Sequence, residues 1–123
     1  EYAILIDSDV LCLNTIPQNL LNCIENSIPV YYNVTSQRYP AYGRDRLIQD
    51  KEILMPGESS LGIWAGGEFI GGDREFYGQL ADEIKQRQQV YFEKYKLFHH
   101  QGDEVLVSVA IESLLRCGLI WWN

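Results

Sequence analysis

The sequence predicts an α/β fold in which helices pack on a mixed sheet. Three observations support this class: an apolar run that ends at a carboxylate (residues 2–6), a β-branched and aromatic run (28–34), and two long helical patterns in the second half. The chain has 123 residues, 46% of them hydrophobic and 22% charged, which is ordinary globular composition. We therefore expect a single layered domain over residues 1–123.

The first half of the chain is expected to hold two strands, one helix and a long loop. The continuous apolar run Tyr2–Ile6 is typical of a strand that is buried on both faces, as in a parallel sheet. A helix capped by Thr15 should follow, and residues 28–34 should form the second strand. The polar stretch 37–56 contains prolines and glycine and predicts a long loop with one helical turn at 44–50.

The second half is expected to be mainly helical. Asp73 caps the clearest helix, which continues to about residue 95. A second helix should begin near Asp103 and end at Gly118. Its apolar stripe is made of Val105, Leu106, Val109, Ala110 and Leu114. The remaining strands are short and are interrupted by paired glycines: 61–65, 69–70 and a final apolar run at 119–122.

Charge and cysteine content restrict the partners and the compartment. The formal charge of −7, from 10 basic and 17 acidic residues, argues against a nucleic-acid binder and against docking on an anionic membrane. No apolar run approaches the roughly 18–20 residues of a transmembrane segment. Cys12, Cys23 and Cys117 are odd in number and lack C-x-x-C spacing, which predicts free, buried thiols in a reducing, cytoplasmic setting.

Both ends of the chain are apolar. Domains usually place polar, dispensable residues at their termini. We therefore expect the chain to be part of a larger domain. Loss of the other part would expose a sheet edge and apolar surface, which favours a homo-oligomer.

The strongest chemical signal is the D-x-D sequence Asp7-Ser8-Asp9 at the carboxyl end of the first strand. Ligands of open α/β sheets bind beyond this end of the strands. Carboxylates at positions i and i+2 point to the same side of an extended backbone, and they repel each other unless a cation lies nearby. Mn²⁺ or Mg²⁺, together with substrate phosphates, would supply that charge. The alternative is a turn in which these side chains cap the next element.

Two further segments contain candidate site residues. The paired glycines, among them Gly66 and Gly67, allow close approach of a ligand or of another strand. Glu68 lies between apolar groups and needs a partner, such as a sugar hydroxyl or an arginine. Asp103 and Glu104 suit the positive end of a helix dipole, which by itself would explain Asp103 as a cap.

Residues 2–13 resemble the metal-binding strand of GT-A fold glycosyltransferases, read as an apolar strand, D-x-D and further apolar residues. Residues 66–72 lie where such enzymes carry a small-residue strand beside the donor sugar, and residues 101–104 resemble their later acidic segment. The resemblance implies the C-terminal part of a GT-A (nucleotide-diphospho-sugar transferase) domain. It also implies that the N-terminal nucleotide-binding half, roughly 80–100 residues, is absent from this chain.

The resemblance implies transfer of a sugar from a nucleotide-diphosphate-sugar donor to a carbohydrate or lipid-linked acceptor, with Mn²⁺ or Mg²⁺ as cofactor. Asp7 would contact ribose or metal, and Asp9 would be the firmer metal ligand. The residues that would bind the sugars are Asp7, Ser8, Gly66, Gly67 and Glu68. Asp103 or Glu104, and after them Glu68, would be the base that an inverting enzyme needs, whereas a retaining enzyme would need none. The fragment by itself is expected to be inactive.

Two alternatives stay open. Haloacid-dehalogenase-like phosphatases also open with an apolar strand and D-x-D, and in that case Asp7 would be the nucleophile, Asp9 the acid/base and Lys51 the counterpart of their lysine. The sequence departs from that pattern because Val10-Leu11 replaces the usual Gly-Thr. The second alternative is a non-catalytic sugar-binding or assembly module with the same fold.

Overall fold

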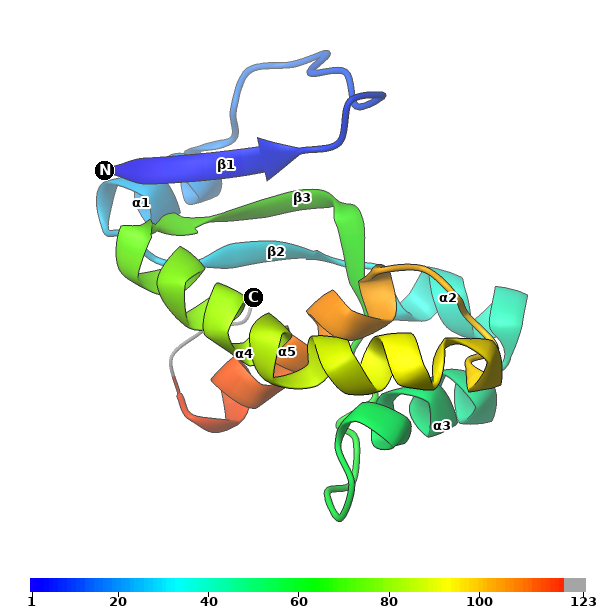
Figure 1. Cartoon of the computed structure of the whole chain (residues 1–123). Helices are drawn as coiled ribbons and strands as arrows, with labels where there is room; N and C mark the ends of the chain where they lie inside the picture. Colours follow the sequence, from blue (N-terminus) through cyan, green and yellow to red (C-terminus); the bar gives the residue numbers. More distant parts are fainter. Residues whose placement is uncertain (119–123) are drawn as a thin grey trace.

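The computed structural model describes residues 1–118 as a small sheet covered by helices (Figure 1). The elements in chain order are β1 (Tyr2–Ile6), α1 (Gln18–Glu25), β2 (Val30–Asn33), α2 (Thr35–Tyr42), α3 (Arg44–Leu54), β3 (Ala65–Asp73), α4 (Arg74–Glu93), the 3₁₀ helix η1 (Tyr95–Leu97) and α5 (Glu104–Arg116). The α/β class is confirmed. The sheet has the order β1-β3-β2, and both described pairings are antiparallel, so the expected mixed sheet is not observed. The strand expected at 119–122 lies outside the described residues.

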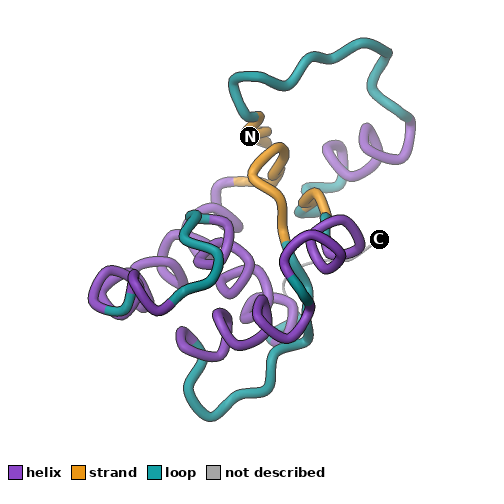
Figure 2. The backbone as a smooth tube through the Cα atoms, turned by 90° about the vertical axis from the view of Figure 1, so that its right-hand side faces the viewer, coloured by secondary structure: helices purple, strands orange, loops and turns teal. Residues whose placement is uncertain are grey.

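Strand β1 forms where it was expected but is not buried on both faces. It lies at one edge of the sheet, and the exposed fraction of Leu5 is 62%. Helices α4 and α5 pack on the central strand β3 instead. The outer edge of β1 has no partner among the described strands, and the connection over residues 7–17 extends away from the rest of the fold in both views (Figures 1 and 2). Self-association through this edge stays a prediction.

The paired glycines do not interrupt β3, which is one continuous strand. The strand expected at 61–65 is wrong, because strand structure begins only at Ala65. A Cβ atom on Gly71 would lie 2.9 Å from Val30 Cγ2 and 3.0 Å from the Tyr2 hydroxyl. A Cβ atom on Gly72 would lie only 2.0 Å from Phe76 Cδ1. The glycines therefore leave room for side chains of the neighbouring strands and of α4 to cross β3.

The prediction of a long loop at 37–56 is wrong, because most of this stretch belongs to α2 and α3. The two helices meet at Gly43, whose φ of 86° suits a residue without a Cβ atom. Pro40 lies inside α2, and α3 continues to Leu54, well beyond the single turn that was expected.

The other helices largely follow the expected pattern. The Asp73 carboxylate caps α4 by accepting the Phe76 N–H at 2.9 Å, as predicted. Gly118 follows α5 with a φ of 73°, which confirms the expected helix end. Thr15 is not a cap, because α1 begins only at Gln18 and the N-cap position is Pro17.

The core lies between β3 and helices α3, α4 and α5. The apolar stripe predicted on α5 is fully buried: Val105, Leu106, Val109, Ala110 and Leu114. The core also holds charge, because Lys51 of α3 and Glu112 of α5 form a buried ion pair. No described helix is long and apolar enough to cross a membrane. The three cysteines are free, as expected, but Cys12 and Cys117 are exposed and Cys23 is half-buried, so the expected burial of these thiols is wrong.

Candidate functional site

A pocket of about 300 Å³ joins three segments that are far apart in the sequence. Its lining comes from the end of β1, the D-x-D segment, the first part of β3 and the start of α5: Leu5, Ile6, Asp7, Ser8, Gly67, Asp103 and Glu104. The Asp7 N–H donates to the Glu68 carbonyl at 3.2 Å, so the pairing of β1 with β3 continues into the D-x-D segment. We call this the strand-end pocket. It contains most of the side chains that the sequence singled out.

Three predicted site residues do not line this pocket. Asp9 lies in the exposed turn that follows β1. Gly66 is buried, and a Cβ atom there would lie 2.0 Å from Glu68 Oε2, so the Glu68 carboxylate is folded over the Gly66 backbone. Glu68 Oε2 is buried and has no hydrogen-bond partner among residues 1–118, so the partner expected for it is not present there.

Asp7 both shapes a turn and lines the pocket. Its Oδ1 accepts the Ser8 N–H at 2.7 Å, and its carbonyl accepts the Val10 N–H at 3.1 Å. These bonds match the turn interpretation of the D-x-D sequence. They leave Asp7 Oδ2 without a hydrogen bond to the described chain, so the same side chain can bind a ligand in the pocket.

The D-x-D carboxylates suit a cation that binds together with the substrate. They do not form a complete metal centre by themselves. Within the described part of the chain, no three His, Cys, Asp or Glu side chains are grouped as a metal site would require. Mg²⁺ in phosphate-transfer sites is commonly bound through one or two carboxylates, with water and substrate phosphates as the other ligands. Asp7 and Asp9, both exposed, can supply that number of oxygen ligands.

Glu104 is held by neighbours on other elements. One of its oxygens, Oε1, accepts Arg38 Nη2 at 2.6 Å, and Oε2 accepts Trp64 Nε1 at 3.1 Å. His100 Nε2 lies 3.4 Å from Oε2, and the His100 ring meets the Trp64 ring edge-on at 5.2 Å between centroids. Because both oxygens are engaged, Glu104 is suited to shaping the pocket wall rather than to accepting a proton.

The turn before α5 is positioned by a buried carboxylate on α3. Asp50 Oδ1 accepts the His99 N–H at 2.9 Å and lies 2.8 Å from His99 Nδ1, while Oδ2 accepts the His100 N–H at 2.7 Å. The side chain of Asp50 is completely buried. Since His100 contacts Glu104, Asp50 positions one wall of the strand-end pocket through the turn.

Asp103 differs from Glu104 in having a free carboxylate. It occupies the N-cap position of α5, but its side chain makes no cap hydrogen bond. The capping interpretation therefore does not account for it. The exposed carboxylate forms no hydrogen bond or ion pair with a described residue, so it is available to a ligand.

Arg38, Trp64, His100 and Asp50 complete the site and were not among the predicted site residues. Arg38 and Glu104 are 66 positions apart, and Arg38 lies in the stretch expected to be a loop. Arg38, Trp64 and Asp50 are distant in sequence from Glu104, so only the fold could bring them together, whereas His100 precedes Glu104 by four positions.

Comparison with known proteins gives no match to a family model, to a curated protein or to a solved structure. The GT-A resemblance read from the sequence therefore stays a prediction, and the functional assignment depends on the residues of this chain.

Proposed function

We propose that the chain is the second part of a metal-dependent glycosyltransferase domain of the GT-A kind, which transfers a sugar from a nucleotide-diphosphate-sugar donor to an acceptor hydroxyl. The supporting observation is the strand-end pocket. Residues of the D-x-D segment, of the glycine-rich strand and of the acidic helix start line one cavity, although each was singled out from a separate stretch of sequence.

The donor would lie between the D-x-D segment and β3. Asp7 and Asp9 would hold Mn²⁺ or Mg²⁺, which supplies positive charge to the departing diphosphate. A Cβ atom on Gly67 would meet nothing within 4 Å, so the strand leaves open space there for the donor sugar. The Ser8 hydroxyl can donate to or accept from a sugar hydroxyl at the same wall.

Asp103 is the proposed base. In an inverting transfer, the acceptor oxygen forms a bond to C1 of the sugar while the bond from C1 to the diphosphate oxygen breaks. The acceptor proton then passes to the Asp103 carboxylate. Arg38 and Trp64 hold the neighbouring Glu104 away from this role. A retaining transfer would not need Asp103, so substitution of Asp103 distinguishes the inverting from the retaining reaction.

The phosphatase alternative is less well supported, because no lysine of the described chain lines the strand-end pocket to serve as the lysine of those enzymes. Lys51 is buried and paired with Glu112, and it does not line the strand-end pocket. A phosphatase of that kind would therefore lack its cation beside Asp7.

The test is a calorimetric titration of Mn²⁺ with a panel of nucleoside diphosphate sugars, for the wild type, Asp7→Asn and Asp45→Asn. Asn at position 7 keeps the acceptor for the Ser8 N–H but removes the charge. We expect Asp7→Asn to weaken metal-dependent donor binding by about tenfold or more, since a hydrogen bond to a charged group contributes about 1.5–3 kcal/mol. Asp45, an exposed carboxylate outside the pocket, is the matched control and should have no effect.

Two results would count against the proposal. Donor binding that is equal in all three proteins would mean that Asp7 is only a turn residue. Mn²⁺ binding without any preference for a nucleotide sugar would favour the phosphatase, and beryllium fluoride would then trap on Asp7.

A further inference from the structure

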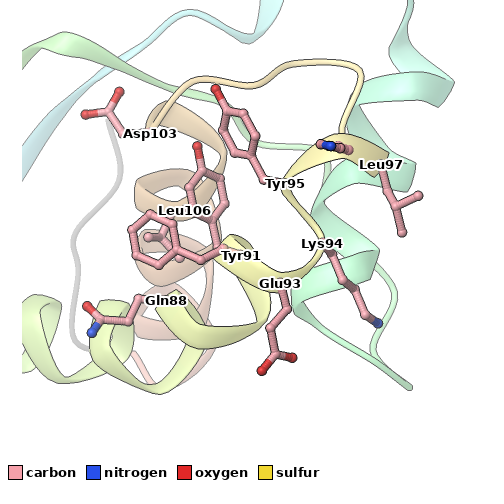
Figure 3. A pocket seen from close by; sticks show the side chains of 10 residues that line it. Gln88, Tyr91, Glu93, Lys94, Tyr95, Leu97, Asp103 and Leu106 are labelled. Carbon is pink, nitrogen blue, oxygen red and sulfur yellow. The ribbon is translucent and has the colours of Figure 1, made fainter.

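A second pocket, of about 1120 Å³, lies along the last turns of α4, the 3₁₀ helix η1 and the first turn of α5 (Figure 3). Its apolar wall is made of Tyr91, Phe92, Tyr95, Leu97 and Leu106, and we call it the aromatic pocket. The proposed donor site does not use this wall. Tyr91 and Leu106 are buried in the core, whereas Phe92 is 70% exposed and Leu97 is 63% exposed, so this outer part of the wall presents apolar side chains to solvent.

The aromatic rings of this wall are held in place. Tyr91 stacks on Phe98 with 5.3 Å between centroids and meets the Tyr95 ring edge-on at 5.6 Å. The hydroxyls of Tyr91 and Tyr95 both donate to the Gln101 carbonyl, at 3.4 and 3.0 Å. The pocket is therefore formed before any ligand binds, which is the usual property of small-molecule sites.

Asp103 lines both the aromatic pocket and the strand-end pocket. Figure 3 shows Asp103 on one side of the aromatic pocket and Leu97 on the opposite side, with Tyr91 and Tyr95 between them. A ligand that fills the pocket thus meets a free carboxylate at one end, aromatic rings in the middle and an aliphatic side chain at the other end.

We propose that the aromatic pocket binds the acceptor, and that this acceptor is a glycoside with an apolar aglycone. Its sugar hydroxyls would face Asp103, and its apolar portion would lie toward Leu97 and Phe92. The assignment rests on the proposed function, in which Asp103 takes the proton of the attacking hydroxyl. It adds a substrate class, because a purely polar sugar would leave the Leu97 end uncovered.

The test compares three probes by NMR titration of the isotope-labelled protein. Octyl β-D-glucopyranoside, kept below its micellar concentration, carries both features; methyl β-D-glucopyranoside lacks the long chain; and octyl tri(ethylene glycol) lacks the sugar. We expect the octyl glucoside to bind at least about tenfold more tightly than the methyl glucoside, because burial of two methylene groups already accounts for that factor. It should also bind more tightly than the glycol.

Substitutions then locate the two ends of the ligand. Leu97→Ser should weaken binding of the octyl glucoside and leave binding of the methyl glucoside unchanged. Leu61→Ser, at an exposed leucine outside this pocket, should change the affinity for neither. Asp103→Asn should weaken binding of both glucosides and leave binding of the glycol unchanged.

Equal affinity for the methyl and octyl glucosides, or a glycol that binds as tightly as the octyl glucoside, would overturn the inference. So would an octyl glucoside affinity that Leu97→Ser leaves intact. Donor binding is measured in a separate titration. Absence of donor binding would count against the proposed transfer reaction. Equal binding of the octyl and methyl glucosides would count only against acceptor binding in the aromatic pocket.

Discussion

Replacing Lys51 by Met would leave the Glu112 carboxylate buried between α3 and α5 without its main cation. Lys51 is 1% exposed and Glu112 is 0% exposed. The same carboxylate accepts the Leu61 N–H and the Ser60 hydroxyl, the latter at 3.2 Å, and lies 3.3 Å from Arg116 Nη2. The pair therefore connects two helices and the loop before β3.

The expected cost follows from these contacts. Removing one partner of a buried ion pair costs about 3–5 kcal/mol, because the other charge stays in a medium of low dielectric constant. Arg116 remains close to Glu112, so we expect about 3 kcal/mol for Lys51→Met. Burial lowers the pKa of Lys51, and the Glu112 carboxylate opposes that change. Because desolvation offsets much of the attraction in a buried ion pair, the intact pair contributes little net stability.

A double variant isolates the charge. In Lys51→Met/Glu112→Gln, the amide oxygen can still accept the Leu61 N–H, and neither substituted position carries a buried charge. We expect the double variant to be more stable than Lys51→Met by about 2 kcal/mol, even though it carries one more substitution.

Urea unfolding followed by circular dichroism measures both effects. With a slope of about 1.5 kcal/mol per molar urea, Lys51→Met should lower the midpoint by about 2 M. Lys85→Met, at an exposed lysine 3.8 Å from Asp82, should change the free energy of unfolding by less than about 0.5 kcal/mol. A loss below about 1 kcal/mol for Lys51→Met, or a double variant no more stable than the single one, would refute the reasoning.

Three further predictions concern β3, α4 and β1. Gly72→Ala should cost about 1–3 kcal/mol, because its Cβ would lie 2.0 Å from Phe76 Cδ1, whereas Gly67→Ala has open space and should be nearly neutral; equal urea midpoints would contradict this. Asp73→Ala should cost about 1 kcal/mol through loss of the α4 cap, and Asp73→Asn should retain most of that stability; an equal loss would exclude the cap as the cause. Burial raises the pKa of Tyr2 to about 12 from its usual value of 10, so the folded state keeps this proton longer than the unfolded chain. Stability should therefore fall as pH rises from 10 to 12, and less so in Tyr2→Phe; identical alkaline unfolding curves would contradict the shift.

Helix α3 shows why part of the fold was not predicted from the sequence. Its buried residues are Leu47, Asp50, Lys51 and Leu54, which follow helical spacing. Two of the four are charged, so an apolar periodicity is not visible. Helix α5 also buries polar side chains, Ser108 and Glu112, but six of its eight buried positions are apolar, and that helix was predicted correctly. Periodicity identifies a helix whose buried positions are mainly apolar, but it misses one in which half of them are charged.

The candidate site was predictable in its ligand-facing part only. Asp7 and Asp103 carry local signals, a strand end and a helix start, and both line the strand-end pocket. The different environments of Asp103 and Glu104 depend on Arg38 and Trp64, which reach Glu104 from other elements. Two adjacent carboxylates look equivalent in sequence, and only tertiary contacts separate them.

The middle position of β3 determines when the sheet can form. Strands β1 and β2 both pair with β3, whereas the order β1-β3-β2 places them apart from each other. A chain synthesised only as far as residue 64 therefore contains two strands without a pairing partner. Closing the sheet requires β1 to meet residues 69–73, across more than half of the chain, and such distant contacts slow folding. The sheet is thus expected to form after the local helices, when β3 has been added between strands made long before it.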